Sequence, residues 1–169
     1  MGGGGGGYTG GISNAGELED LAKQRLEKLN NLDKICNLFV PHAWDYGEEY
    51  QRLLSLLEDA EDFNFNDYSI PREDPIDADT IKQLEEGLRD QIRHATVVLI
   101  PAGMYVAYST SIQKEIELAK QLGKPIVAVK PWGSEVIPTF IQDNADIIVG
   151  WSKDSIVDAI NLARSKRQQ

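Results

Sequence analysis

Short apolar runs alternate with amphipathic segments along most of this chain, and this alternation restricts the possible folds more than any other feature. The runs have the length of strands, most are rich in Val and Ile, and they span residues 35–40, 63–65, 96–100, 126–129 and 146–149. Strands that are apolar throughout are typical of a parallel sheet with helices on both faces. Right-handed crossovers then give a doubly wound α/β fold, in which ligands bind beyond the carboxyl ends of the strands.

The segments between these runs carry apolar side chains at helical spacing. We expect helices at residues 47–60, 80–94 and 154–165, and a single helical turn near residues 139–142. Asp154 is expected to cap the last of these helices. In the helix at residues 80–94, the side chains expected to face the core are Ile81, Leu84, Leu88 and Ile92.

The first part of the chain differs in composition from the rest. Residues 1–14 are mostly glycine, and burial there cannot offset chain entropy, so we expect a flexible tail. Residues 15–31 form a polar helical segment with a narrow apolar seam, made by Leu18, Ala22, Arg25 or Leu26, and Leu29. This helix either docks on the following domain or pairs with a copy of itself. The domain is expected at residues 32–165, and residues 166–169 form a short tail.

The overall composition excludes several classes of function. The formal net charge of −10 argues against non-specific nucleic-acid binding, because such binding depends on Lys and Arg neutralising phosphates. No apolar run approaches membrane-spanning length and no signal peptide is recognisable, so we expect a cytoplasmic protein. The chain has two His and one Cys, without the CxxC or HExxH spacing of metal sites, and we expect no metal. Glycine-rich phosphate loops are also absent after the apolar runs.

The stretch YSTSIQKEIELA, residues 108–119, carries the most informative acidic side chain. Thr110 and Gln113 fit a capping box, which places the start of a helix near Ser111. At about 100° per residue, Glu115 falls inside an apolar stripe, whereas Glu117 points away from it. A carboxylate on the core-facing side of a helix is paired, hydrogen-bonded or functional. Residue type alone leaves open whether Glu115 caps a neighbouring loop, pairs with an Arg or acts on a ligand. The apolar members of the stripe are Ile112, Ile116, Ala119 and Leu122.

Three features are expected to meet at the carboxyl edge of the sheet. They are the turn at residues 41–45, the polar loop at residues 66–79 and the start of the helix that bears Ser111 and Glu115. In the turn, one interpretation is that His42 is a surface residue and Trp44 packs against a helix. The other is that both rings stack on a base or nicotinamide ring. Arg72 in the loop is either a solvated charge or a phosphate contact.

The chain resembles the TIR-like domains grouped with the ThsB protein of the bacterial Thoeris anti-phage system. The segments that carry this resemblance are LFVPHAWDY, FNDYSIPREDP, VVLIPAGMYVAYSTSIQKEIELAK, GKPIVAVKPWG and ADIIVGWSKDSIVDAI, and together they cover residues 36–163. The resemblance implies a flavodoxin-like TIR fold with five parallel strands and helices on both faces. It also identifies residues 66–79 as the BB loop, which lines the TIR active site and joins neighbouring subunits into a homo-oligomer.

Active members of this family cleave the nicotinamide–ribose bond of NAD, so NAD is the implied substrate and no further cofactor is expected. Many ThsB-like proteins then cyclise the ADP-ribose part into a diffusible signal that activates an effector protein. The family's catalytic Glu, in a pattern like W-x-x-x-E, falls on Glu115. The substrate-binding positions implied by the resemblance are His42, Ala43, Trp44, Tyr68, Arg72 and Ser111.

Two positions depart from the family pattern. Ser111 stands where the pattern has an aromatic residue, and Pro41 stands where a Ser usually follows the first strand. A proline has no backbone N–H to offer a ligand. These departures leave open an altered product, low activity or a site completed by another subunit. A non-catalytic assembly module and a different nucleotide hydrolase on the same fold are the alternatives.

Overall fold

The computed structural model describes residues 15–41, 48–69, 79–130, 133 and 136–167. The chain divides into two compact units, residues 1–34 and residues 35–169, which we describe separately. The expected flexible tail at residues 1–14 lies outside the described residues. In the part of the chain that the structure describes, no helix is both long and apolar enough to cross a membrane.

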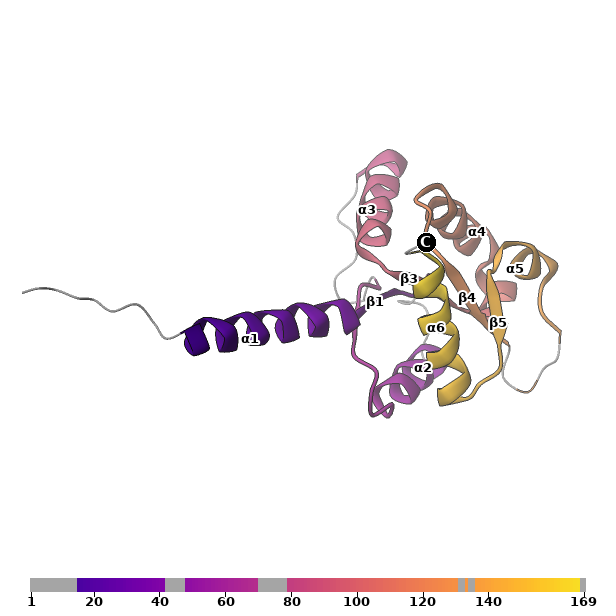
Figure 1. Ribbon diagram of the computed structural model, residues 1–169. Coiled ribbons are helices and arrows are strands. Elements are labelled where there is room, and N and C mark those ends of the chain that lie inside the picture. The colour runs from indigo at the N-terminus through magenta and orange to yellow at the C-terminus, as the bar shows by residue number, and fades with distance from the viewer. Residues whose placement is uncertain (1–14, 42–47, 70–78, 131–132, 134–135, 168–169) are drawn as a thin grey trace, which may run out of the picture. The chain divides into compact units, whose positions relative to one another are not determined.

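The second unit is built on a five-stranded sheet in which every pairing is parallel, as the sequence predicts (Figure 1). The strand order is β2-β1-β3-β4-β5. The strands are β1 (Cys36–Phe39), β2 (Phe65–Asp67), β3 (Val97–Pro101), β4 (Ile126–Val129) and β5 (Ile147–Val149). All residues of β3 and β4 are buried, because these central strands are covered on both faces.

Helices cover both faces of this sheet (Figure 1). On one face, α2 (Glu48–Glu58) packs against α6 (Lys153–Arg167). On the other face, α3 (Ile81–His94) packs against α4 (Tyr105–Gln121). The short helix α5 (Thr139–Asn144) lies beside α4, where the rings of Tyr105 and Phe140 stack with centroids 5.6 Å apart. The architecture is the α/β fold with a parallel sheet that the alternation of apolar runs predicts.

The second strand lies further along the chain than the predicted residues 63–65. Cys36 pairs with Phe65, and the N–H of Cys36 donates to the carbonyl of Asn64 (2.9 Å). Phe63 precedes the ladder and is buried, and its ring stacks on that of Phe65 with centroids 5.8 Å apart. Its apolar character therefore reflects packing at the end of a turn, which the sequence pattern does not distinguish from strand pairing.

Two predictions about helix faces and ends also need correction. Ile81 and Leu84 are 78% and 44% exposed, whereas Ile92 is fully buried, so only the later turns of α3 pack on the domain. Ser152, not Asp154, caps α6: the N–H of Ser155 donates to the Ser152 hydroxyl (3.2 Å), since the helix already includes Asp154 in its first turn. The same helix continues to Arg167, into the segment expected to be a tail.

Cys36 lies in the buried core at the start of β1. Burial raises the pKa of its thiol to about 11, because a thiolate loses its hydration in an apolar environment. The thiol therefore stays neutral and unreactive near neutral pH.

Lys124, between α4 and β4, is buried at 7% exposure. Its ammonium donates to the carbonyls of Arg93 (2.6 Å) and Ala95 (2.7 Å). Both carbonyls lie where α3 ends, and a helix leaves its last carbonyls without intrahelical partners. Gly123, at φ 65°, supplies the left-handed turn that ends α4 and places Lys124 there.

The first unit contains α1 (Ala15–Lys34), which extends beyond the predicted residues 15–31. Its described side chains, those of residues 15–27, are all exposed. Within this helix Leu18, Leu21 and Leu26 are 56%, 61% and 58% exposed.

Candidate functional site

Helix α4 carries the predicted catalytic residue, but it starts at Tyr105 and not near Ser111. The chain leaves β3 through a 3₁₀ turn at Ala102–Met104 and passes from it directly into α4. Thr110 is therefore inside the helix and cannot cap it. Gln113, expected to reach back to the cap, instead donates from its side-chain amide to the Tyr105 hydroxyl (2.5 Å).

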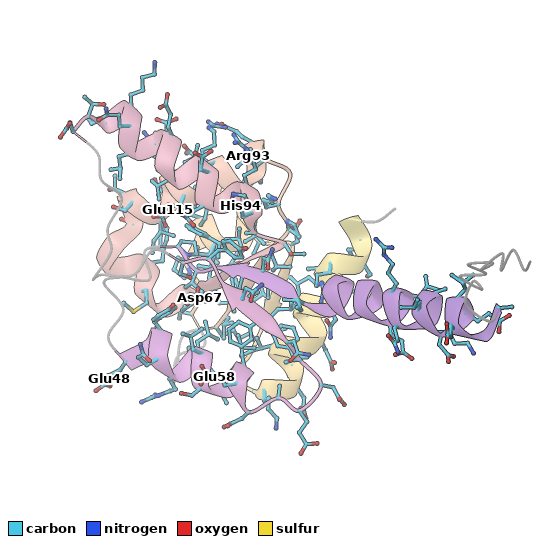
Figure 2. All side chains as sticks on the ribbon, turned by 90° about the vertical axis from the view of Figure 1, so that its left-hand side faces the viewer. Glu48, Glu58, Asp67, Arg93, His94 and Glu115 are labelled. Atoms are coloured by element: carbon cyan, nitrogen blue, oxygen red, sulfur yellow. The ribbon has the colours of Figure 1, made fainter. Side chains whose placement is uncertain are left out.

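Glu115 lies on the buried face of α4. It is 4% exposed, its neighbours Ile112 and Ile116 are fully buried, and Glu117 is exposed. This confirms the predicted apolar stripe and the place of the carboxylate within it. Figure 2 shows Glu115 on the α3 side of the sheet, opposite the side where α2 presents Glu48 and Glu58.

The early start of α4 changes the surroundings expected for Glu115. The residue is ten positions after Tyr105 (115 − 105), which is about 15 Å along the helix axis. The field of a helix N-terminus falls off within the first turn, so it does not act on this carboxylate. The prediction that Ser111 and Glu115 sit at a helix start on the carboxyl edge is therefore wrong.

Ser111 is one turn before Glu115 on the same helix, yet it is exposed. Further along the helix, two side-chain contacts join α4 to α3. Lys114 forms an ion pair with Glu85 (3.1 Å), and the Arg89 guanidinium donates to the Gln121 side-chain amide oxygen (3.0 Å). Because Ser111 is small and exposed, it leaves space on the surface of α4 where the family pattern has an aromatic side chain.

A hydrogen-bond network joins the ends of β1 and β2 to the first turn of α2. One carboxylate oxygen of Asp67 accepts from the Tyr50 hydroxyl, and the other accepts from the N–H of Ser69 (2.9 Å). The Ser69 hydroxyl in turn accepts from the N–H of Val40 (3.0 Å). Sequence reasoning missed this network, although Asp67 followed by Ser69 is the spacing of an Asx turn. It holds the segment from which residues 70–78 continue.

Burial raises the pKa of two groups in this first turn of α2. The pKa of Tyr50 is raised chiefly by burial and further by its hydrogen bond to Asp67, so the phenol remains a donor. Burial also raises the pKa of Glu49, against the opposing charge of Arg52. Among the described residues, the buried oxygen Oε2 of Glu49 has no hydrogen-bond partner. Burial thus raises the pKa of both Glu49 and Tyr50 in this turn.

Tyr68, a predicted substrate contact, is part of the sheet margin. Its N–H donates to the carbonyl of Leu38 (2.8 Å), and its ring stacks on that of His94 with centroids 5.8 Å apart. This contact with His94 was not predicted. It places the Tyr68 ring against the end of α3, and Figure 2 shows His94 on the same side of the sheet as Glu115.

The other predicted substrate-binding residues, His42, Ala43, Trp44 and Arg72, lie outside the residues that the structure describes. Pro41, which replaces the family's Ser, is buried directly after β1. Among the described residues, no group of three or more His, Cys, Asp or Glu side chains is arranged to hold a metal ion.

A cavity of about 390 Å³ opens at the opposite, amino edge of the sheet. None of the predicted site residues lines it. Its lining includes Lys120, Lys124 and Lys166, together with Asn144 and Asp146. The lysines are close to helix carboxyl ends, where positive charge is favourable, and Lys120 donates to Asn144 (3.0 Å). We therefore interpret this edge as structural.

A comparison with protein families gives one match to this chain. The family described as the TIR-like domain of the Thoeris protein ThsB matches residues 39–136. The match includes Glu115, Ser111, Tyr68 and Arg72. No curated protein matches the chain.

Proposed function

Because this chain belongs to the TIR-like domain family of the Thoeris protein ThsB, we propose that it consumes NAD by breaking the nicotinamide–ribose bond. The fold and the family support this proposal. So does the single observation that carries it, a carboxylate buried to 4% exposure on the matched helix α4. Burying a carboxylate is costly, and the family resemblance gives the catalytic role to this position.

In the proposed reaction Glu115 acts on the ribose that loses nicotinamide. The bond to nicotinamide breaks with its electron pair leaving on the nicotinamide nitrogen, and positive charge develops on the ribose. A carboxylate held close to this charge stabilises it, and its oxygens also accept hydrogen bonds from the ribose hydroxyls. Water attacking the same carbon gives ADP-ribose and releases a proton. Attack by a hydroxyl of the adenosine side gives a cyclic product that activates an effector protein.

The burial of Glu115 implies a conformational step before the reaction. A group that is 4% exposed is not open to a dinucleotide, so the covering segment has to move.

The network of Tyr50, Asp67 and Ser69 supports the loop at residues 66–79 in this proposal. The resemblance places that loop against the substrate and against a neighbouring subunit. Within it Arg72 would contact the pyrophosphate. His42 and Trp44, with Ala43 between them, would offer flat surfaces to the nicotinamide ring after β1.

The direct test is release of nicotinamide from NAD by the purified protein, alone and in lysate from phage-infected cells. Glu115→Gln keeps the shape of the side chain and removes its charge, so it should abolish the release. Glu117→Gln makes the same change on the exposed face of α4 and should leave the rate unchanged. Turnover that survives Glu115→Gln, in a protein with unchanged thermal unfolding, would refute the assigned role of this residue.

A panel of other nucleotides and deoxynucleosides separates NAD consumption from a different hydrolase on the same fold. Hydrolysis of one of these compounds with NAD left intact would replace NAD as the substrate. Self-assembly without turnover of any compound would favour an assembly module.

A further inference from the structure

Helix α1 exposes three large apolar side chains. Leu18, Leu21 and Leu26 are 56%, 61% and 58% exposed, and the helix belongs to a compact unit of its own, residues 1–34. A 20-residue helix gains most of its stability from packing an apolar face against another element. The exposed leucines therefore mark a surface that requires an occupant.

These leucines lie on one side of the helix. At about 100° per residue, Leu18, Ala22 and Leu26 span about 80° and Leu21 borders them on the other flank. Arg25 is the one charged residue within this stripe. Acidic and basic residues such as Asp20, Lys23 and Glu27 occupy the opposite side. The helix is thus amphipathic, with a single cation inside its apolar seam.

The seam is complementary to itself when one copy is reversed. Its positions are 15, 18, 22, 25, 29 and 32, and the same spacing results when the sequence is read backwards. In such an antiparallel pair Arg25 lies over Ala22 of the second copy, where a small side chain leaves space for it. Glu19 of the second copy is one turn away, within reach of the guanidinium.

A parallel pair lacks this complementarity. It sets Arg25 directly against Arg25 of the second copy, and two like charges at a seam position oppose association. In a pair related by a two-fold axis, both copies use the same surface patch, so every contact is made twice. We infer that α1 is a self-association element, which pairs antiparallel with α1 of a second copy of this chain. This inference does not depend on the proposed reaction.

The test measures the mass of the full chain in solution by sedimentation over about a hundredfold range of concentration. The native chain should shift from monomer to dimer as concentration rises. Leu18→Glu places a charge within the seam and should weaken the dimer at least about tenfold. Lys23→Gln changes the net charge by the same amount on the polar side and should leave the dimer constant unchanged.

Cysteine cross-linking tests the orientation, because Cys36 is buried and does not compete. In an antiparallel pair, cysteines at position 22 of the two copies are about 4.5 Å apart along the axis, and cysteines at position 18 are about 16 Å apart. Ala22→Cys should therefore form a disulfide-linked dimer and Leu18→Cys should not. Efficient cross-linking of both variants would indicate a parallel pair and overturn the orientation.

Three further outcomes would overturn self-association. The native chain could remain a monomer at every concentration. Leu18→Glu could weaken a dimer no more than Lys23→Gln does. A monomer whose thermal unfolding temperature falls with Leu18→Glu, and not with Lys23→Gln, would show that the seam docks on its own domain.

Discussion

Two charged side chains are buried in the described part of the chain, Glu115 within α4 and Lys124 just beyond its end. Both lie in the segment that runs from α4 to the start of β4, but their surroundings differ. Lys124 donates to the carbonyls of Arg93 and Ala95, which a helix end leaves without backbone partners. Glu115 lies between Ile112 and Ile116 on the face that packs on the domain. The comparison shows that burial alone does not distinguish a structural charge from a functional one.

The difference lies in what each charge is needed for. The Lys124 ammonium donates to carbonyls that the end of α3 leaves without backbone partners, so its burial stabilises the fold. Glu115 instead stands at the position of the proposed catalytic carboxylate, within the segment that the family match covers. We therefore expect substitutions at the two positions to separate stability from activity, and the following experiments test that expectation in order of decreasing effect.

The largest effect is expected for Glu115→Gln on turnover. Removing a group that stabilises transition-state charge typically costs about 3–4 kcal/mol, or about 10²–10³-fold in rate. Thermal unfolding of the same variant shows whether the protein is still folded when turnover is lost. A large loss of stability would place Glu115 in the same class as Lys124 and break the comparison.

The next largest effect is expected for Lys124→Met on stability. This change keeps the aliphatic stem and removes the donor to the carbonyls of Arg93 and Ala95, of which the Ala95 contact is buried, so the free energy of unfolding should fall by about 2–4 kcal/mol. Urea denaturation measures it. The control is Lys120→Met, which removes an exposed lysine of the same cavity and should cost less than about 0.5 kcal/mol. Equal effects of the two changes would contradict a structural role of Lys124.

A smaller effect is expected for Tyr50→Phe, which removes one hydrogen bond to Asp67. The free energy of unfolding should fall by about 1 kcal/mol. The pKa of Tyr50 is raised in the folded state above its usual value of about 10, so its contribution is present below about pH 10 and is lost as the pH rises further. Unfolding measured from neutral to alkaline pH should show the native chain losing this advantage over Tyr50→Phe above about pH 10.

The same variant tests whether the network of Tyr50, Asp67 and Ser69 serves stability alone or also activity. If the network only holds the fold, turnover by Tyr50→Phe should match the native rate once the protein is folded. If it also positions the loop at residues 66–79, turnover should fall while the protein remains folded. A loss of stability that does not depend on pH would contradict the role given to the phenol.

The smallest effect is expected for Ser111→Trp, which restores the aromatic residue of the family pattern. Ser111 is exposed, so stability should change by less than about 0.5 kcal/mol. A ring that packs beside the bound ribose should raise kcat/KM about two- to tenfold. Ser111→Leu adds an apolar side chain without a ring and should have no such effect. A gain for both variants would attribute the effect to apolar contact in general.

The pattern T-x-x-Q occurs at two places in this chain and illustrates what local sequence can predict. At Thr80 and Gln83 it forms a complete capping box at the start of α3. At Thr110 and Gln113 it lies inside α4, because the 3₁₀ turn after β3 has already started the helix. The local signal is the same, and the conformation of the preceding residues decides whether it is used.

The sequence by itself was sufficient to predict the parallel α/β fold and the burial of Glu115. Both follow from periodicity, since the angle per residue decides which side chains share a face. It was not sufficient to predict where α4 starts, that Ile81 stays exposed, or that Tyr50 bonds to Asp67. Those features depend on contacts between segments far apart in the chain, which are settled only when the elements pack against one another.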